Sequence, residues 1–170
     1  NSLSLKSIAD GSERAIAGLP ANLAVASLGW SPDQRYVAVN HIDSTAGANE
    51  LWLVDVERAQ AHRLLGGLNT VLGDGYAWLP DSSGLLVRLQ PAGARTAPPA
   101  DPIPTGPAIQ STEGDGQVRA IRTYQDLLGS PADAAQFDYY TQVQPAIVSL
   151  GGKVQPVGQP GIYLGLSLSP

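Results

Sequence analysis

The chain has 170 residues, no cysteine, and 15 acidic against 10 basic residues, which gives a formal net charge of −5. The missing cysteine excludes a disulfide framework and a thiolate metal site, and the scattered basic residues argue against a nucleic-acid partner, which needs concentrated positive charge. The longest apolar stretch, residues 23–30, is far shorter than the ~20 residues of a membrane span.

One pattern occurs repeatedly along the chain at an offset of 48 residues. Residues 1–33 align with residues 49–81 without a gap, and the strongest match is Trp-Ser-Pro-Asp at 30–33 with Trp-Leu-Pro-Asp at 78–81. A third copy starts with Leu-Ser-Pro at 168–170. A fixed period of this length is typical of repeat architectures, in which each repeat is one supersecondary unit.

Within a repeat the hydrophobic pattern has a period of two. Residues 36–40 and 51–56 are short runs rich in β-branched and aromatic residues, bounded by turn residues, and such runs predict strands. Four antiparallel strands in a repeat of this size form a propeller blade. In the first full repeat we expect one strand to end at Trp30 and the others to cover residues 35–42, 50–56 and 61–65.

The sequence therefore predicts an all-β fold, a partial β-propeller of four-stranded antiparallel blades with a loop-plus-short-helix insertion in one blade. We expect residues 1–170 to form a single propeller segment. Its predicted parts are a partial blade at 1–17, a blade at 24–66, a blade at 73–157 with an insertion at about 91–143, and the start of the next blade at 162–170.

The insertion has two parts of different character. Residues 91–107 hold several prolines, which favour an extended loop. Ser-Pro-Ala-Asp at 130–133 has the pattern of a capping box with proline at the first helical position, and Thr-x-x-Asp at 123–126 has a similar one. Apolar residues at helical spacing follow, so the second part is predicted to be helical.

Three strings in the insertion are distinctive: Gly-Pro-Ala-Ile-Gln at 106–110, Arg-Thr-Tyr-Gln-Asp-Leu-Leu at 122–128 and Phe-Asp-Tyr-Tyr at 137–140. They resemble the propeller domain of bacterial peptidases in the prolyl oligopeptidase family. The resemblance covers essentially the whole chain and is closest to the acylaminoacyl-peptidase and glutamyl-endopeptidase-like branch. It implies that the complete protein is a serine peptidase whose propeller covers the active site of a C-terminal α/β-hydrolase domain and limits access to peptides.

No catalytic, cofactor-binding or metal-binding residue is predicted in the chain itself, because it contains no G-x-S-x-G nucleophile string. The start at Asn1 without methionine or leader suggests a fragment. By analogy with relatives we expect a periplasmic or secreted location, with a cytoplasmic one left open. The alternative is a TolB-like periplasmic propeller adaptor that binds partner proteins, because Trp-Ser-Pro-Asp turns also occur there.

Several conspicuous side chains are assigned structural roles. His41 and His62 are the only histidines and lie on different predicted strands, so both are expected to be structural, with little cost for replacing His41 by alanine. Trp30 and Trp78 occupy equivalent repeat positions and are predicted to pack between neighbouring blades. Trp52 has no tryptophan at its equivalent repeat position, and its side chain should lie on the face of the sheet opposite to those of Leu51 and Leu53.

The insertion is the candidate functional region. Long insertions on a propeller hairpin commonly contact another domain or gate an opening, and the alternative is that this one packs on its own blade. Unpaired strands at 2–8 and 162–168 also predict self-association of the isolated chain. The residues expected to make gating or domain-interface contacts are Arg122, Tyr124, Asp126, Tyr139 and Tyr140.

Overall fold

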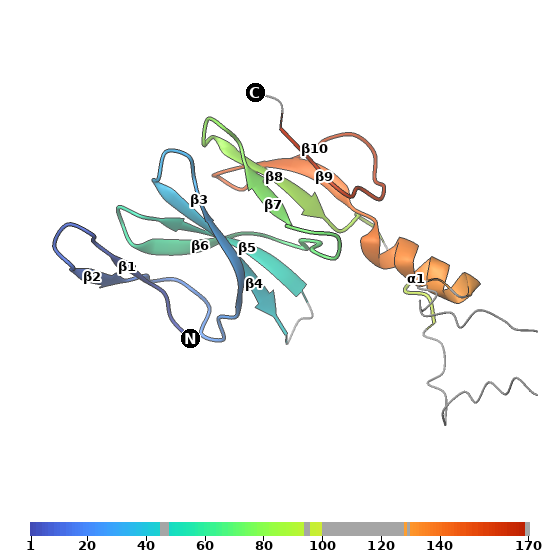
Figure 1. Cartoon of the computed structure of the whole chain (residues 1–170), viewed down its shortest axis with the longest axis horizontal. Coiled ribbons are helices and arrows are strands. Elements are labelled where there is room, and N and C mark those ends of the chain that lie inside the picture. Colours follow the sequence, from blue (N-terminus) through green and yellow to red (C-terminus); the bar gives the residue numbers. More distant parts are fainter. Residues whose placement is uncertain (45–47, 94–95, 100–127, 129, 169–170) are drawn as a thin grey trace, which may run out of the picture. The chain divides into compact units, whose positions relative to one another are not determined.

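Three antiparallel sheets and one helix make up the regular structure in the computed structural model of the chain (Figure 1). The structure describes residues 1–44, 48–93, 96–99, 128 and 130–168. The chain divides into two units, one formed by Asn1–Gly93 with Thr141–Pro170 and the other by Ala94–Tyr140.

All three sheets belong to the larger unit. The first four-stranded sheet has the order β3-β4-β5-β6, the second has the order β7-β8-β9-β10, and β1 pairs with β2. The strands are β1 (Ser4–Lys6), β2 (Glu13–Ala15), β3 (Val25–Trp30), β4 (Tyr36–Asp43), β5 (Ala48–Asp55), β6 (Gln60–Gly66), β7 (Tyr76–Trp78), β8 (Gly84–Leu89), β9 (Gln144–Ser149) and β10 (Val154–Pro156). In each four-stranded sheet the strands follow the chain order, as in a propeller blade.

The two-stranded sheet repeats the outer half of the first blade. Leu5 of β1 lies opposite Arg14 of β2, just as Leu53 of β5 lies opposite His62 of β6, 48 residues later. Because the register is the same, β1 and β2 correspond to the third and fourth strands of a blade.

The second blade has the same strand register as the first, although an insertion separates its strands β8 and β9 in the sequence. Leu85 lies opposite Val148, which reproduces the pairing of Val37 with Val54 in the first blade. The insertion at residues 90–143 therefore changes the length of one connection and leaves the strand pairing intact.

The turn between the first two strands has the same geometry in both blades. Gln34 and its repeat equivalent Ser82 both have a positive φ, 61° and 60°. In each turn the carboxylate of the preceding aspartate, Asp33 or Asp81, accepts a hydrogen bond from the backbone N–H two residues further on, at 3.1 and 3.0 Å. Aspartate stabilises turns in this way, which explains the repeated Pro-Asp pair.

Side chains from both faces of the first blade are buried. Ala38 packs with residues of the second blade, such as Leu85 and Val148, while the neighbouring Val37 and Val39 pack on the other face with apolar residues that precede β3. The period of two thus gives a strand buried on both sides. Full burial of one such valine or leucine contributes roughly 1.5–3 kcal/mol, so these two clusters hold the blades together.

A close backbone approach joins β2 to the first blade. Ala17 forms a parallel bridge with Gln60, and the Ala61 N–H donates to the Ala17 carbonyl oxygen at 2.7 Å. At the next residue, Gly18, φ is +85° and an added Cβ would lie 2.3 Å from the Ala61 carbonyl oxygen. Glycine is therefore required at this junction.

The insertion contains the predicted short helix, α1 (Pro131–Thr141). The Ser130 hydroxyl accepts a hydrogen bond from the Asp133 N–H at 3.1 Å, and an Asp133 carboxylate oxygen accepts one from the Ser130 N–H at 2.9 Å. These reciprocal bonds form the predicted capping box. The other predicted cap, at 123–126, lies outside the described residues.

The fold prediction is confirmed: the chain is a partial β-propeller of four-stranded antiparallel blades with a helical insertion in one of them. One detail is wrong, because residues 162–168, predicted as a strand, have no regular structure; the preceding Gly161 forms a bridge with Val143. A strand needs a neighbouring backbone along its length, and among the described residues none pairs with this segment. No helix in the described ranges is long and apolar enough to span a bilayer.

Candidate functional site

Two of the predicted gating residues lie on α1. The rings of Tyr139 and Tyr140 meet edge to face, with centroids 5.0 Å apart and an interplanar angle of 86°. Tyr140 is 50% exposed and Phe137 is 40% exposed. The helix therefore presents aromatic rings that are partly accessible. The other three predicted residues, Arg122, Tyr124 and Asp126, lie outside the described residues, so the gating assignment stays a prediction.

The seam between the two full blades is held by aromatic side chains of β7. The Trp78 indole Nε1–H donates a hydrogen bond to the Gly29 carbonyl oxygen at 3.0 Å, and the Tyr76 hydroxyl donates one to the Ala38 carbonyl oxygen at 3.1 Å. Burial raises the pKa of the Tyr76 hydroxyl, so it remains a donor at neutral pH. The prediction that Trp78 packs between neighbouring blades is confirmed by these contacts.

Trp30 differs from its repeat equivalent. Its side chain is 50% exposed, and that of Leu28 on the same strand is 53% exposed. The prediction that Trp30 is buried between blades is therefore wrong for this chain. The physical reason is that Trp30 faces the side on which, among the described residues, only the outer strands β1 and β2 are present.

The other conspicuous residues have structural surroundings. Trp52 is half-buried against the apolar cluster on the β1–β2 side of the first blade, and its indole N–H donates to Glu50 at 2.9 Å. His41 is 1% exposed, and its Nδ1 accepts a hydrogen bond from the Ala24 N–H at 3.1 Å. His62 is exposed on β6, two strands away, in register with Ala38 and not with His41. The two histidines do not form a catalytic or metal-binding pair.

Sequence reasoning missed a buried guanidinium. Arg88 on β8 is 7% exposed, and it donates hydrogen bonds to the carbonyl oxygens of Leu72 (2.7 Å) and Leu164 (3.3 Å). It lines a cavity of about 230 Å³ together with Asp74. An arginine among the apolar residues of a predicted strand is the feature of the sequence that could have indicated this buried group. The guanidinium links the loop between β6 and β7 to the segment after β10, and its N–H donors suit polar or anionic ligands.

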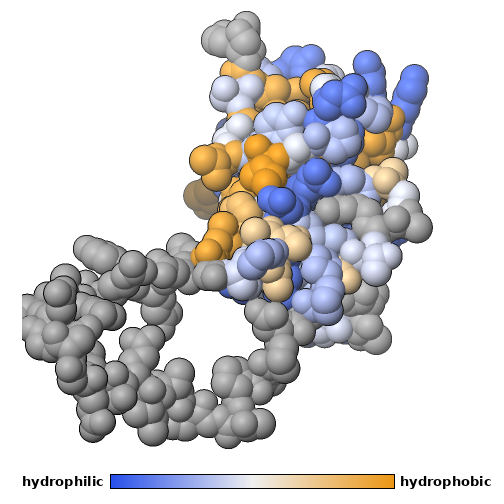
Figure 2. Space-filling model, turned by 90° about the vertical axis from the view of Figure 1, so that its right-hand side faces the viewer, coloured by the Kyte–Doolittle hydropathy of each residue, from blue (hydrophilic) through white to orange (hydrophobic). Residues whose placement is uncertain are grey.

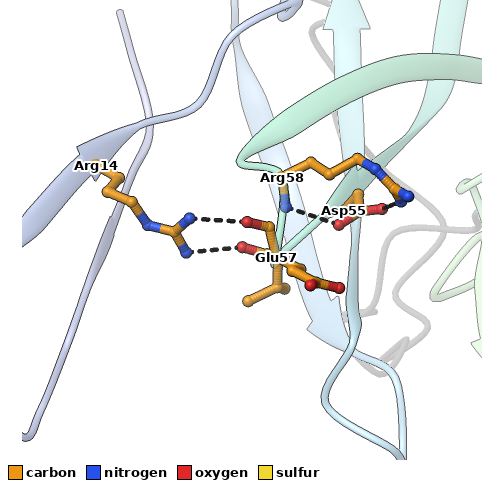
Figure 3. A network of polar contacts seen from close by, with 5 residues as sticks. Arg14, Asp55, Glu57 and Arg58 are labelled. Atoms are coloured by element: carbon orange, nitrogen blue, oxygen red, sulfur yellow. Dashed lines mark hydrogen bonds and ion pairs between the residues drawn. The ribbon is translucent and has the colours of Figure 1, made fainter.

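A polar network attaches the β1–β2 sheet to the turn between β5 and β6 of the first blade (Figure 3). Arg14 on β2 donates to the carbonyl oxygens of Glu57 and Val56 at 2.8 and 2.9 Å. In the same turn the Arg58 backbone N–H donates to Asp55, and the two side chains form an ion pair at 2.5 Å. The backbone bond is the main cause of a lowered Asp55 pKa. The contacts of Arg14 hold β2 against the turn between β5 and β6.

Within the part of the chain that the structure describes, no group of three or more histidine, cysteine, aspartate or glutamate side chains could hold a metal ion. Apolar side chains interrupt the polar surface on the face drawn in Figure 2.

The chain is similar over nearly its whole length to two plant proteins named as probable chloroplastic glutamyl endopeptidases. The identity is 38% over 169 residues with the protein from Oryza sativa subsp. japonica, which covers 94% of this chain and 18% of the relative. With the protein from Arabidopsis thaliana it is 34% over 164 residues, covering 92% and 17%. The chain thus spans less than a fifth of the length of these relatives.

Two solved acylaminoacyl peptidases share the fold. The enzyme from Pyrococcus horikoshii superposes with a TM-score of 0.50 at 16% identity, covering 94% of this chain and 21% of its own. An acylaminoacyl peptidase in complex with Z-Gly-Gly-Phe-chloromethyl ketone gives 0.51 at 14% identity, covering 95% and 21%. No protein-family model matches the chain. The resemblance predicted from the insertion strings is confirmed by these relatives.

Proposed function

We propose that this chain is a non-catalytic propeller segment of a serine peptidase, which covers and gates the active site of an α/β-hydrolase domain elsewhere in the parent protein. The observation that carries the proposal is the 38% identity with a probable glutamyl endopeptidase over 94% of the chain. The peptidase activity, its peptide substrates and the hydrolase partner all belong to the parent protein in this proposal.

The arrangement of the loops supports a gating role at one end of the blades. The insertion leaves the sheet after β8, and there Gln90 donates a hydrogen bond to the Gly67 carbonyl oxygen in the loop after β6 at 2.8 Å. Where the chain returns, Val143 pairs with Gly161 in the loop after β10. Residues 90 and 143, where the insertion begins and ends, therefore lie beside the segments that follow β6 and β10, whereas the Pro-Asp turns lie at the opposite ends of the strands. Long loops on a rigid scaffold are typical sites of recognition.

The parent reading frame provides the first test. We expect roughly 250 residues after the propeller with a G-x-S-x-G string, then aspartate, then histidine, in the order of an α/β-hydrolase triad. A parent that contains propeller blades and no such domain would overturn the proposal in favour of the TolB-like adaptor.

Gating is tested in the parent protein by replacing residues 90–143 with a four-residue turn, the length that connects β4 to β5 in the first blade. We expect the shortened protein to hydrolyse long polypeptides faster relative to a short peptide than the original does. An unchanged ratio in a protein that keeps its thermal midpoint would contradict gating. The 170-residue chain alone should show no turnover that a serine-directed inhibitor blocks.

A further inference from the structure

We infer that the face carrying Leu28 and Trp30, together with the free edge of β1, is a docking site for a β-hairpin that supplies the two inner strands of a propeller blade. The second strand of this hairpin pairs antiparallel with β1, and the first offers a backbone carbonyl oxygen to the Trp30 indole. We call this surface the hairpin site. The inference concerns the blades alone and does not rest on the proposed peptidase function.

The first observation is the strand that has one partner. Among the described residues β1 pairs with β2 alone, and its register matches that of β5, which has β4 on its other side. In the first blade Leu53 lies opposite Ala38. A second strand paired with β1 would therefore place its equivalent of Ala38 opposite Leu5, the repeat equivalent of Leu53.

The second observation is that the chain contains a completed example of the same interface. Trp78 and Tyr76 occupy the positions of Trp30 and Leu28, and both are partly covered by the first blade, where they donate to the carbonyl oxygens of Gly29 and Ala38 at 3.0 and 3.1 Å. These acceptors lie on the first and second strands of that blade. Trp30 needs a partner of the same kind, an inner strand pair, to reach the same environment.

The third observation defines the hairpin chemically. A Cβ added at Gly29 would lie 3.4 Å from the Tyr76 hydroxyl oxygen, already in van der Waals contact, so the first strand favours a small residue where β7 crosses it. The second strand must be apolar on both faces, as residues 37–39 are. Residues 25–43, which form β3 and β4, meet both conditions. The occupant is thus a hairpin of the chain's own repeat type.

The repeat suggests the experiment. Residue 1 is equivalent to residue 49, so a second copy of residues 24–48 joined directly ahead of Asn1 reproduces the spacing of an unbroken repeat. In this extended chain we expect hydrogen exchange of the Trp30 indole to slow at least tenfold and the β1 amides to become protected, with a higher thermal midpoint. Trp30→Phe identifies the indole signal by removing it.

The matched control is the extended chain in which the added copy carries aspartate at the position copied from Gly29. A Cβ at Gly29 points to Tyr76, the repeat equivalent of Leu28, so this variant keeps the length and the second strand but places a charged side chain on the face that Leu28 and Trp30 must cover. Slowing of the Trp30 indole should then be lost while β1 stays protected. Unchanged exchange at both sites in the extended chain would overturn the inference. So would protection that appears only on dimerisation in light scattering, because the occupant would then be a second copy.

Discussion

Trp78 donates its indole hydrogen bond across the seam to the carbonyl oxygen of Gly29, 3.0 Å away, and thereby links the first strands of two successive blades. The equivalent Trp30 is half exposed. Two tryptophans at equivalent repeat positions are therefore in different environments. Comparing their substitutions shows how much of the free energy of unfolding comes from packing in the seam.

Trp78→Ala should lower the free energy of unfolding by about 3 kcal/mol, because it removes a large aromatic side chain from a packed seam. Trp30→Ala should cost about 1 kcal/mol or less, since half of that side chain is already in water. Trp78→Phe keeps most of the apolar area and loses the hydrogen bond, which costs about 1 kcal/mol. Urea unfolding measures all three, and equal effects at positions 30 and 78 would contradict the assignment of the seam.

His41→Ala should be strongly destabilising, by about 2–3 kcal/mol. The side chain is 1% exposed and accepts a hydrogen bond from the Ala24 N–H, so its removal leaves a cavity and an unpaired donor. The sequence predicted a small cost at this position, and the burial reverses that expectation. The control is His62→Ala on exposed β6, which should stay within about 0.5 kcal/mol. Similar values for the two variants in chemical unfolding would speak against it.

The carboxyl group of Asp10, in the turn between β1 and β2, should titrate near pH 2. Its pKa is lowered to about 2, mainly by a hydrogen bond from the Ser7 side chain and next by the Ser12 N–H. Because the folded pKa lies below the unfolded value of about 3.9, the stabilisation is present above pH ~4 and is lost as the pH falls towards 2.

Carbon-13 titration of the Asp10 carboxyl group by NMR checks this value. Ser7→Ala should move the midpoint upwards. Ser83→Ala removes a hydroxyl that bonds to Asp81, at 2.7 Å, and should leave Asp10 unchanged. A midpoint near 3.9 in the unaltered chain would show that the turn is not formed as described.

Ser130→Ala should loosen the start of α1. The substitution removes the hydroxyl that accepts the Asp133 N–H, and the loss of such a cap costs about 1 kcal/mol of helix stability. Amide exchange should become about fivefold faster in the first turn of α1. Ser130→Asp, which keeps an acceptor at the cap, should restore the slower exchange, whereas equal rates in all three chains would refute the cap.

The isolated chain should associate reversibly, because it exposes large apolar side chains that water does not favour. Sedimentation velocity should give a weight-average mass above 17.7 kDa that falls on dilution. Trp30→Lys should weaken the association, and a monodisperse monomer at all concentrations would exclude it. The most exposed of these side chains are Ile8, Leu28, Trp30, Val71 and Leu164.

Sequence patterns predicted those features of the fold that depend on residues close together in the chain or on the repeat. The capping pattern at Ser130 forms as expected, and the 48-residue offset appears in the register of β1 with β2. Burial at Trp30 depends on a neighbouring blade and cannot be read from the repeat. Arg88 lies in a strand of apolar neighbours, and two carbonyl oxygens contributed by distant loops explain its burial.

The identical pairing of β4 with β5 and of β8 with β9 has a consequence for how such chains diversify. The first connection has four residues and the second has 54, at positions 44–47 and 90–143. Loop-closure entropy grows only with the logarithm of length, so this difference costs about 2 kcal/mol. A propeller blade can therefore accept an inserted segment between its second and third strands and keep its strand pairing. The connection between Leu89 and Gln144 is consequently a suitable place for grafting other sequences.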